Sequence, residues 1–396
     1  MDRSKESYSE QDQFSVKKTA SPSPLEATLK TRFITDVNEL CERLNLPKDL
    51  AQKQCLSAKA FPLRFPESVL DRVTKGNVDD PILKQFLPDP LELKQTPGFF
   101  ADPLRENLAT IPCKNGQAVS DEPSCILQKY IGRALVLTTN DCAARCRFCF
   151  RRSSLRRALF PIVDADQKKG SPQVENKAAN GPDFNERLES VFAPVRANPS
   201  IHELVFSGGD PLTLSNDQLK SLLDYIKTLR AVNRVRFHSR VPILVPQRID
   251  QGFPSSDDIN RRDSSKTLIL HISLHVNSPN EINGSVVNSL AELRRRGYLL
   301  TSQTVLLKGI NDSVEVLVEL FEKLANAGVI PYYLHQLDHV QGAAHFETPV
   351  AKGLQLMKEI ASRLPGYAVP RYVREIPGRA MKTDLQAEPD ADVDYD

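Results

Sequence analysis

Short apolar runs alternate with amphipathic stretches from about residue 133 to the end of the chain. The apolar runs are rich in Val, Ile, Leu, Thr and aromatic residues, a composition typical of buried strands. Six of them are predicted as strands, at 134–139, 203–206, 234–240, 268–276, 299–307 and 331–337. The stretches between or after them carry apolar residues at helical spacing, at 215–232, 285–297, 313–328 and 352–364. This alternation predicts parallel strands that are joined by helical crossovers.

Strand–helix units of this kind predict an α/β fold, specifically a partial (β/α)6 barrel of the TIM type. A flat, doubly wound sheet is the alternative, because hydrophobic periodicity does not distinguish the two. In both folds, ligands bind at the carboxyl ends of the strands. Residues that directly follow a predicted strand are therefore the first candidates for chemistry.

The rest of the chain has a different pattern. Residues 1–25 are rich in Ser, Lys, Glu and Gln, which predicts a disordered tail. Residues 26–125 have a helical pattern that prolines break into several short helices. We assign the barrel to 126–345 and a last helix with a C-terminal extension to 346–396. The polar stretch 164–186, punctuated by Gly and Pro, is predicted as a surface excursion.

Composition excludes several classes of protein. Apolar residues make up 40% of the 396 residues and charged residues 26%, which is typical of a globular protein. The formal net charge of +2 argues against a nucleic-acid binder. No run of 18 apolar residues occurs, so no membrane span is expected. The stretch MDRSKESYSEQDQ fits neither a secretory signal nor a transit peptide, and we expect a cytoplasmic protein.

Three of the seven cysteines, Cys142, Cys146 and Cys149, fall within eight residues directly after the first predicted strand. An odd total and a cytoplasmic setting argue against disulfides. Tight thiolate clusters bind zinc or iron–sulfur centres. Three close thiolates suit three irons of a [4Fe–4S] cluster and leave the fourth iron open to a substrate.

Two other interpretations of these cysteines remain open. They are three unrelated buried cysteines, or a zinc site that Cys113 or Cys125 completes. A structural zinc site needs four ligands. No further Cys or His follows at ligand spacing, and the next histidine is His202.

The second predicted strand ends in Ser207, Gly208, Gly209 and Asp210. Two glycines after a strand allow the backbone to approach a ligand closely. The carboxylate beside them has the charge to meet an ammonium group. The alternative is an ordinary Gly-Gly turn with an Asp that starts the next helix.

The segment CAARCRFC, at 142–149, resembles the CxxxCxΦC motif of radical S-adenosylmethionine (SAM) enzymes, with Phe148 as the aromatic residue. This resemblance implies that the open iron binds the amino and carboxylate groups of SAM. One electron then releases a 5′-deoxyadenosyl radical. The segment 207–210 is similar to the family's GGE-type motif, in which the backbone and the acid hold the SAM amino group.

Four further segments, 240–249, 273–281, 302–312 and 331–346, together resemble lysine 2,3-aminomutases. The resemblance runs from about Phe61 to Leu385. It implies a fold with a radical SAM barrel and a C-terminal extension that binds pyridoxal phosphate. It also implies that His275 and Gln303 contact SAM.

The same resemblance implies the second cofactor and the substrate contacts. Lys382 falls on the lysine that binds pyridoxal phosphate, and Lys129 and Arg133 on basic residues near its phosphate. The substrate is a zwitterion with a distal amine. Its implied contacts are Arg151 for the α-carboxylate, and Asp338 and Glu375 for the distal ammonium.

The segments 60–73 and 333–346 resemble the branch that makes (R)-β-lysine for elongation factor P. No cysteine follows Cys149, so the C-terminal zinc ligands of catabolic lysine aminomutases are absent. The resemblance implies free L-lysine as substrate, an electron donor such as flavodoxin or ferredoxin, and a separate ligase for elongation factor P. Four alternatives remain: an aminomutase for glutamate or arginine, a catabolic lysine enzyme, a radical enzyme without pyridoxal phosphate, and a non-catalytic zinc module.

Overall fold

The computed structural model describes residues 22–106, 125–152, 158–160, 182–262 and 266–391. Most of the predicted tail, most of the predicted excursion at 164–186 and Cys113 lie outside these ranges. Helix α1 (Pro24–Leu29) begins inside the segment predicted as tail, and α4 (Pro182–Ala197) begins inside the predicted excursion.

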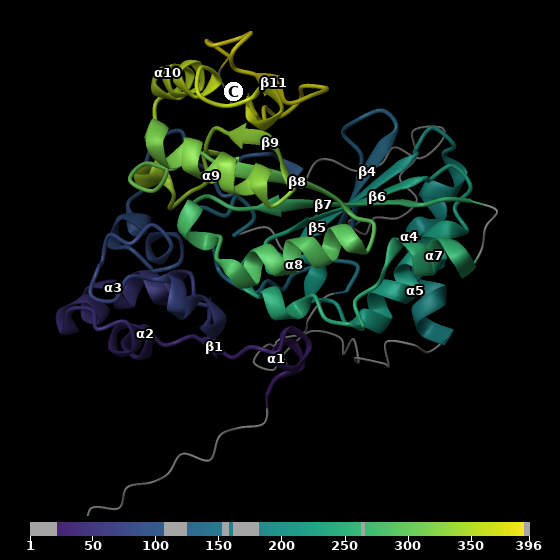
Figure 1. Ribbon diagram of the computed structural model, residues 1–396, viewed down its shortest axis with the longest axis horizontal. Coiled ribbons are helices and arrows are strands. Elements are labelled where there is room, and N and C mark those ends of the chain that lie inside the picture. Colours follow the sequence, from purple (N-terminus) through teal and green to yellow (C-terminus); the bar gives the residue numbers. More distant parts are fainter. Residues whose placement is uncertain (1–21, 107–124, 153–157, 161–181, 263–265, 392–396) are drawn as a thin grey trace, which may run out of the picture.

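One nine-stranded sheet forms the centre of the molecule, in the order β11-β10-β9-β8-β7-β6-β5-β4-β3 (Figure 1). Its strands are β3 (Ile126–Leu127), β4 (Arg133–Thr139), β5 (Glu203–Gly208), β6 (Arg234–Ser239), β7 (Ile269–His275), β8 (Leu299–Val305), β9 (Ile330–His335), β10 (Arg371–Arg374) and β11 (Thr383–Asp384). The predicted strands correspond to β4–β9, which pair in parallel. Strand β10 adds a further parallel strand, and β3 and β11 pair antiparallel at the two edges.

The strand order settles the choice between the two predicted folds. The parallel strands neighbour one another in sequence order, without the reversal that creates the crevice of a doubly wound sheet. Lys129 and Tyr130, which precede β4, hydrogen-bond to Glu375, which follows β10. In a flat sheet, strands six positions apart would be separated by about 30 Å. The sheet is therefore curled, and the predicted partial barrel is confirmed.

Helices cover the outside of the sheet, with α8 and α9 in front of the strands in Figure 1. The predicted helices correspond to α5 (Asn216–Lys227), α8 (Gly284–Arg295), α9 (Val314–Asn326) and α10 (Val350–Ala361), and two shorter helices are α6 (Val241–Leu244) and α7 (Ser256–Arg262). Helices α8 and α9 end before Gly297 and Gly328, whose φ angles are +81° and +73°. A glycine in this left-handed conformation terminates a helix, so both helices end two residues earlier than predicted.

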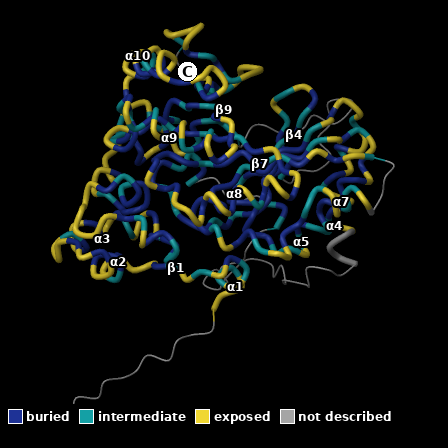
Figure 2. The backbone as a smooth tube through the Cα atoms, in the orientation of Figure 1, coloured by how far each residue is buried: buried dark blue, intermediate teal, exposed yellow. Residues whose placement is uncertain are grey.

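The N-terminal region consists of short elements, as the prolines predict. They are α1, α2 (Val37–Arg43), α3 (Lys48–Ala60), β1 (Phe33–Ile34), β2 (Phe65–Pro66) and the 3-10 turns η1 (Glu67–Arg72), η2 (Leu83–Gln85) and η3 (Pro90–Leu93). Leu40, Phe65 and Phe86 belong to the same hydrophobic core as Phe206 and Phe237 of the barrel. Figure 2 shows the buried strands at the centre and exposed residues on the outer helices and loops.

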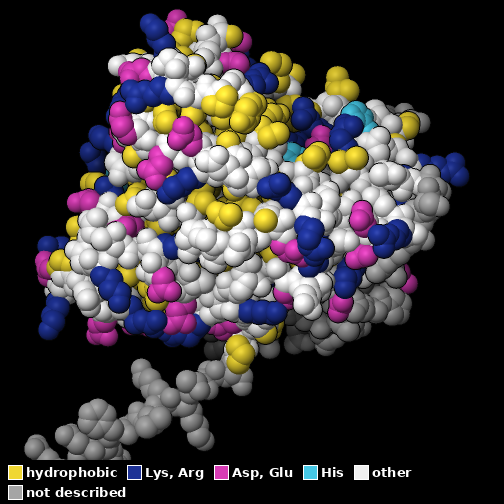
Figure 3. Space-filling model, in the orientation of Figure 1, with side chains coloured by type: hydrophobic (Ala, Val, Ile, Leu, Met, Phe, Trp, Pro, Cys, Tyr) yellow, Lys and Arg dark blue, Asp and Glu magenta, His cyan; other side chains and the backbone are white. Residues whose placement is uncertain are grey.

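The surface has no strong charge bias on the face that Figure 3 shows, where cationic and anionic side chains are interspersed. None of the helices in the described part of the chain is long and apolar enough to cross a membrane.

A buried ion pair connects the N-terminal region to the cysteine-bearing loop. The Arg147 side chain is fully buried, and its Nε and Nη2 donate to the Glu92 carboxylate over 2.7 and 2.6 Å. Its Nη1 donates to the Phe61 carbonyl over 2.8 Å, and Arg152 adds a second cation 2.9 Å from Glu92. Removal of one partner from such a pair leaves an uncompensated buried charge.

We predict that Glu92→Gln lowers the free energy of unfolding of the apoprotein by about 3–5 kcal/mol, the usual cost of breaking a buried ion pair. Urea denaturation measures the change. Glu189→Gln is the matched control, because Glu189 pairs with Arg196 on an exposed surface and its loss should leave the urea midpoint unchanged. Equal midpoints for the two variants would contradict the anchoring role of Glu92.

Candidate active site

The cysteine loop follows the carboxyl end of β4, where a barrel of this type binds its ligands. Cys142, Cys146 and Cys149 are free and half-buried. Phe148 is 4% exposed, and its ring contacts His275, at the end of β7, edge-on with 5.6 Å between the centroids. The loop thus turns inward over the strand ends.

The three thiols fit an iron–sulfur cluster by their chemistry. Burial, reinforced by the neighbouring thiols, raises the pKa of Cys142, and it raises the pKa of Cys149 to about 11. Cys142 and Cys149 therefore keep their protons until a metal centre compensates the thiolate charge. No three His, Cys, Asp or Glu side chains of the described ranges converge as ligands of one metal ion. A [4Fe–4S] cluster does not require such convergence, because each thiolate binds a different iron.

The glycine pair packs against the start of the cysteine loop. Gly208 has a φ of +102°, and a Cβ on Gly209 would lie 2.2 Å from the Asp141 carbonyl oxygen. The Gly209 N–H donates to the Thr139 carbonyl over 2.6 Å, and the Asp210 N–H donates to the Asp141 carbonyl over 2.8 Å. The glycines thus allow β5 to hold the residues just before Cys142 by their backbone.

Asp210 is engaged within the protein. Its Oδ1 accepts from the Leu212 N–H and the Ser239 hydroxyl, over 3.0 and 2.7 Å. Its Oδ2 accepts from the N–H groups of Arg240 and Val241, over 2.7 and 3.1 Å. These bonds indicate that Asp210 braces the ends of β5 and β6. Its predicted contact with the SAM amino group stays a prediction.

His275 and Gln303, the other predicted SAM contacts, are cross-strand partners at the ends of β7 and β8. Burial, together with the charge of Arg240, lowers the pKa of His275 to about 3, so this ring is neutral. The Asn277 amide nitrogen lies 3.2 Å from His275 Nε2, and the Gln303 amide nitrogen lies 3.5 Å from His238 Nε2. The barrel therefore places both predicted residues on one patch of strand ends.

The predicted pyridoxal phosphate residues also lie together. The Glu375 carboxylate forms ion pairs with both Lys382 and Lys129. Burial raises the pKa of Glu375, but these two ammonium groups outweigh burial and lower it overall. The Tyr130 hydroxyl donates to Glu375 over 3.4 Å, and the Arg133 guanidinium lies 4.3 Å from the centre of the Tyr130 ring. A lysine, two further cations and an aromatic ring suit a phosphorylated aromatic cofactor.

Arg151 lies in the interior with its side chain fixed. Its Nε and Nη2 donate to the Glu106 carboxylate, each over 2.7 Å, and its Nη1 donates to Ser207 Oγ over 2.8 Å. Burial lowers its pKa, but the charges of Glu106, Cys149 and Asp338 outweigh burial and raise it. Asp338 is therefore in electrostatic contact with Arg151.

Asp338 itself joins this site to Lys382. Burial raises the pKa of Asp338 to about 7, the charge of Lys382 lowers it, and the charges of Glu375 and Glu106 raise it. The three residues predicted to bind substrate, Arg151, Asp338 and Glu375, thus interact within one electrostatic cluster that also includes Lys382.

Sequence reasoning missed several residues of this site. Glu106 stands in the stretch ADPLREN, which has no periodicity or spacing that marks it. Tyr130 lies within QKYIGR, where the resemblance singles out only the basic residues Lys129 and Arg133. His238 and His335 are half-buried; burial lowers the pKa of both, and nearby cations, Lys382 among them, lower it further. A histidine in a strand alone gives no signal of this kind.

Comparisons with known proteins agree with this geometry. A family described as "4Fe-4S single cluster domain" matches residues 131–238. The L-lysine 2,3-aminomutase of Escherichia coli (strain K12) is 37% identical over 90% of this chain and 92% of that protein. The enzyme of the same name from Haemophilus influenzae is 35% identical over 91% of this chain and 95% of that protein. The enzyme of Clostridium subterminale is 30% identical over 89% of this chain and 75% of that protein.

The chain belongs to the lysine 2,3-aminomutase family. The resemblance predicted from the motifs is thereby confirmed at the level of the family. Lysine 2,3-aminomutases are isomerases, and the match to an iron–sulfur domain together with this membership implies a [4Fe–4S] cluster, SAM and pyridoxal phosphate as cofactors.

We predict that Gly209→Ala lowers the iron and sulfide bound per chain after anaerobic reconstitution, because the new methyl group displaces Asp141 and with it the start of the cysteine loop. Iron and sulfide analysis measures the effect. Gly284→Ala is the matched control, since a Cβ at that helical position meets nothing within 4 Å. Full cluster content in Gly209→Ala would show that the close packing is not needed.

Proposed function

We propose that this aminomutase converts (S)-α-lysine to (R)-β-lysine. One observation carries the proposal: a buried cation, Arg151, and two acids, Asp338 and Glu375, interact in the same cluster as Lys382. This is the charge pattern of a site for an amino acid with a distal ammonium group.

The α-carboxylate of the substrate would bind Arg151. A guanidinium has five N–H donors, and three of those of Arg151 are engaged by Glu106 and Ser207. One N–H remains on each terminal nitrogen. The planar fork is then held by its neighbours while it still offers two donors to a carboxylate.

The distal ammonium would bind between Asp338 and Glu375. In this structure Glu375 is paired with Lys382 and Lys129, the two lysines predicted to bind pyridoxal phosphate. When Lys382 and Lys129 engage the cofactor, the Glu375 carboxylate loses both lysine partners and keeps the hydrogen bond from the Tyr130 hydroxyl. Cofactor loading therefore releases an acid for the substrate.

The cofactors supply the chemistry that amino-acid side chains lack: the cluster and SAM supply a radical that abstracts hydrogen, and pyridoxal phosphate supplies a π-system for the migrating amine. The chain positions the partners and shields them. His275, Gln303 and the backbone of 207–209 would bind SAM, and Lys382, whose charge acts on Asp338, would bind pyridoxal phosphate. His238 and His335 are neutral, because burial and nearby cations lower their pKa, so they add no competing charge.

We propose further that the product serves the β-lysylation of elongation factor P by a separate ligase. The segments 60–73 and 333–346 support this branch by their resemblance, as does the absence of cysteines after Cys149. The single electron for each radical would come from a flavodoxin or a ferredoxin.

The direct test is anaerobic reconstitution with iron, sulfide, SAM, pyridoxal phosphate and a reductant, followed by product analysis with L-lysine, L-glutamate and L-arginine. We expect β-lysine from lysine alone. Lys382→Ala should lose both the product and the absorbance of bound pyridoxal phosphate, whereas Lys352→Ala, at an exposed ion pair with Asp312, should retain both. Faster turnover of glutamate or arginine would overturn the substrate assignment, and full activity without pyridoxal phosphate would overturn the cofactor assignment.

The pKa of Asp338 predicts a pH dependence. A carboxyl with a pKa of about 7 is neutral below that pH and binds an ammonium only above it. We therefore expect kcat/KM for lysine to rise with pH through about 7. The charge of Lys382 lowers the pKa of Asp338, so cofactor binding at Lys382 moves the midpoint upward.

Asp338→Asn should abolish this rise of kcat/KM with pH, the acidic limb of the pH profile. It should also lower kcat/KM by about tenfold to a hundredfold, the cost of one charged hydrogen bond. Asp312→Asn is the control, because Asp312 lies in a surface pair with Lys352. An unchanged acidic limb in Asp338→Asn would assign it to another group.

A further inference from the structure

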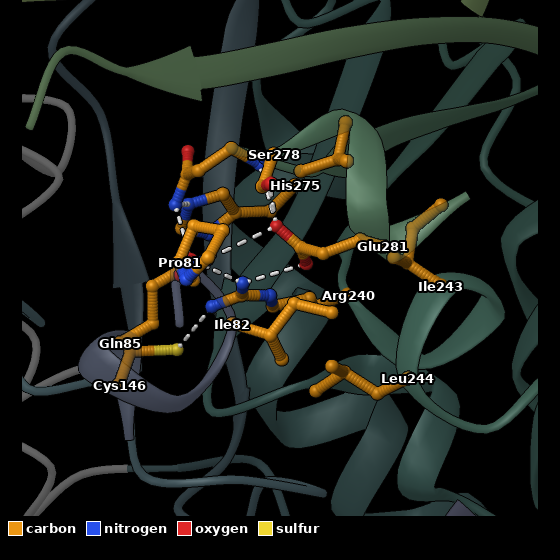
Figure 4. Close-up of polar contacts among 12 residues, drawn as sticks. Pro81, Ile82, Gln85, Cys146, Arg240, Ile243, Leu244, His275, Ser278 and Glu281 are labelled. Atoms are coloured by element: carbon orange, nitrogen blue, oxygen red, sulfur yellow. Dashed lines mark hydrogen bonds and ion pairs between the residues drawn. The ribbon is translucent and has the colours of Figure 1, made fainter. Parts of the chain in front are cut away.

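Arg240, the first residue after β6, directly contacts the cysteine loop. Its side chain lies in the interior and is 6% exposed. Nη1 donates a hydrogen bond to Cys146 Sγ over 3.0 Å, and Figure 4 shows the guanidinium between this thiol and the turn that follows β7. A predicted cluster ligand therefore has a permanent cation as hydrogen-bond donor.

Two other segments hold the guanidinium in this position. Nη2 donates to Glu281 Oε2 over 2.8 Å and to Gln85 Oε1 over 2.5 Å. The Phe86 ring covers the guanidinium, with 4.7 Å between the guanidinium carbon and the ring centre. Contacts from η2, from the turn after β7 and from the cysteine loop together leave Arg240 little rotamer freedom.

Glu281, the anion of this network, is fixed as firmly as the cation. Its side chain is 1% exposed, and Oε1 accepts from the backbone N–H groups of Asn277 and Ser278 over 2.9 and 3.0 Å. Gln85 Nε2 donates to the same oxygen over 3.2 Å. The network therefore fixes one cation near the thiols and one anion behind it (Figure 4).

Stability alone does not account for this arrangement. A buried ion pair contributes little net stability, because desolvation of both charges offsets their attraction, and apolar side chains often replace such a pair without loss. Arg240 Nε is also buried and finds no partner among the described residues. The burial of the Arg240 guanidinium therefore costs free energy of desolvation. A functional role would explain this burial if the guanidinium acts on a group that is bound at the cysteine loop.

We propose that Arg240 is a positioning residue that raises the reduction potential of the iron–sulfur cluster through its hydrogen bond to the Cys146 sulfur. The proposal rests on the proposed function, since it requires the cluster. Reduction moves one electron from the donor protein to the cluster and makes the cluster more negative. A cationic donor at a ligand sulfur stabilises the reduced state more than the oxidised state.

The test is a measurement of the midpoint potential of the cluster. A redox titration without SAM or lysine gives this potential, and electron paramagnetic resonance detects the reduced cluster. Arg240→Met removes the charge and the donor but retains much of the side-chain volume. We expect a reduction equilibrium constant about tenfold lower, which corresponds to about 59 mV for one electron. Arg240→Lys keeps the charge and should stay within about threefold of the wild type.

Glu281→Gln separates electrostatics from damage to the loop. It removes the anion behind Arg240, while Gln85 still accepts from the guanidinium. The potential should therefore shift upward, opposite to Arg240→Met. A role limited to packing would leave both potentials unchanged or shift them in the same direction, and either result overturns the proposal.

The outcomes remain distinct from those of the lysine assay. Unchanged potentials at full iron and sulfide content contradict the role of Arg240 and leave lysine conversion untouched. If the midpoint potentials shift as expected but the lysine assay yields no β-lysine, only the substrate assignment is contradicted. If Arg240→Met takes up no cluster, an unchanged potential in Glu281→Gln still overturns the proposal.

Discussion

Two buried arginine–glutamate pairs hold the cysteine loop. Arg147 pairs with Glu92 of the N-terminal region, and Arg240 pairs with Glu281 of the barrel; the exposed fractions of the four side chains range from 0 to 6%. The loop has no helix or strand of its own between Cys142 and Cys149. Its geometry therefore depends on these ion pairs, because a rearranged loop would leave a buried charge without a partner.

The N-terminal region consequently helps to fix the cysteine loop. Arg64 donates to the Cys142 carbonyl over 2.9 Å, and the Gln85 carbonyl accepts from the Arg147 N–H over 2.9 Å. The cysteine loop thus contacts the N-terminal region through Arg64 and Gln85. It also contacts the residues that follow β5 and β6. The two ends of the curled sheet also meet, because Lys129, before β4, pairs with Glu375, after β10.

The sequence predicts this molecule well where the signal is local. Buried strands appear as apolar runs, and the spacing of Cys142, Cys146 and Cys149 is itself the motif. Strand β10, RYVR, was missed because four residues with two arginines carry no apolar run. Glu106 and the engaged state of Asp210 depend on partners far away in the chain, such as Arg151 and Ser239, so only tertiary contacts reveal them.

The central claim is that three thiolates hold a [4Fe–4S] cluster with one iron open to SAM. Mössbauer spectroscopy of protein reconstituted anaerobically with isotopically enriched iron and sulfide tests this claim most directly. We predict a cubane spectrum in which a single iron site changes when SAM is added. Bound zinc without a cubane cluster would contradict the account. A cubane cluster whose iron signals all stay unchanged when SAM is added would contradict it as well.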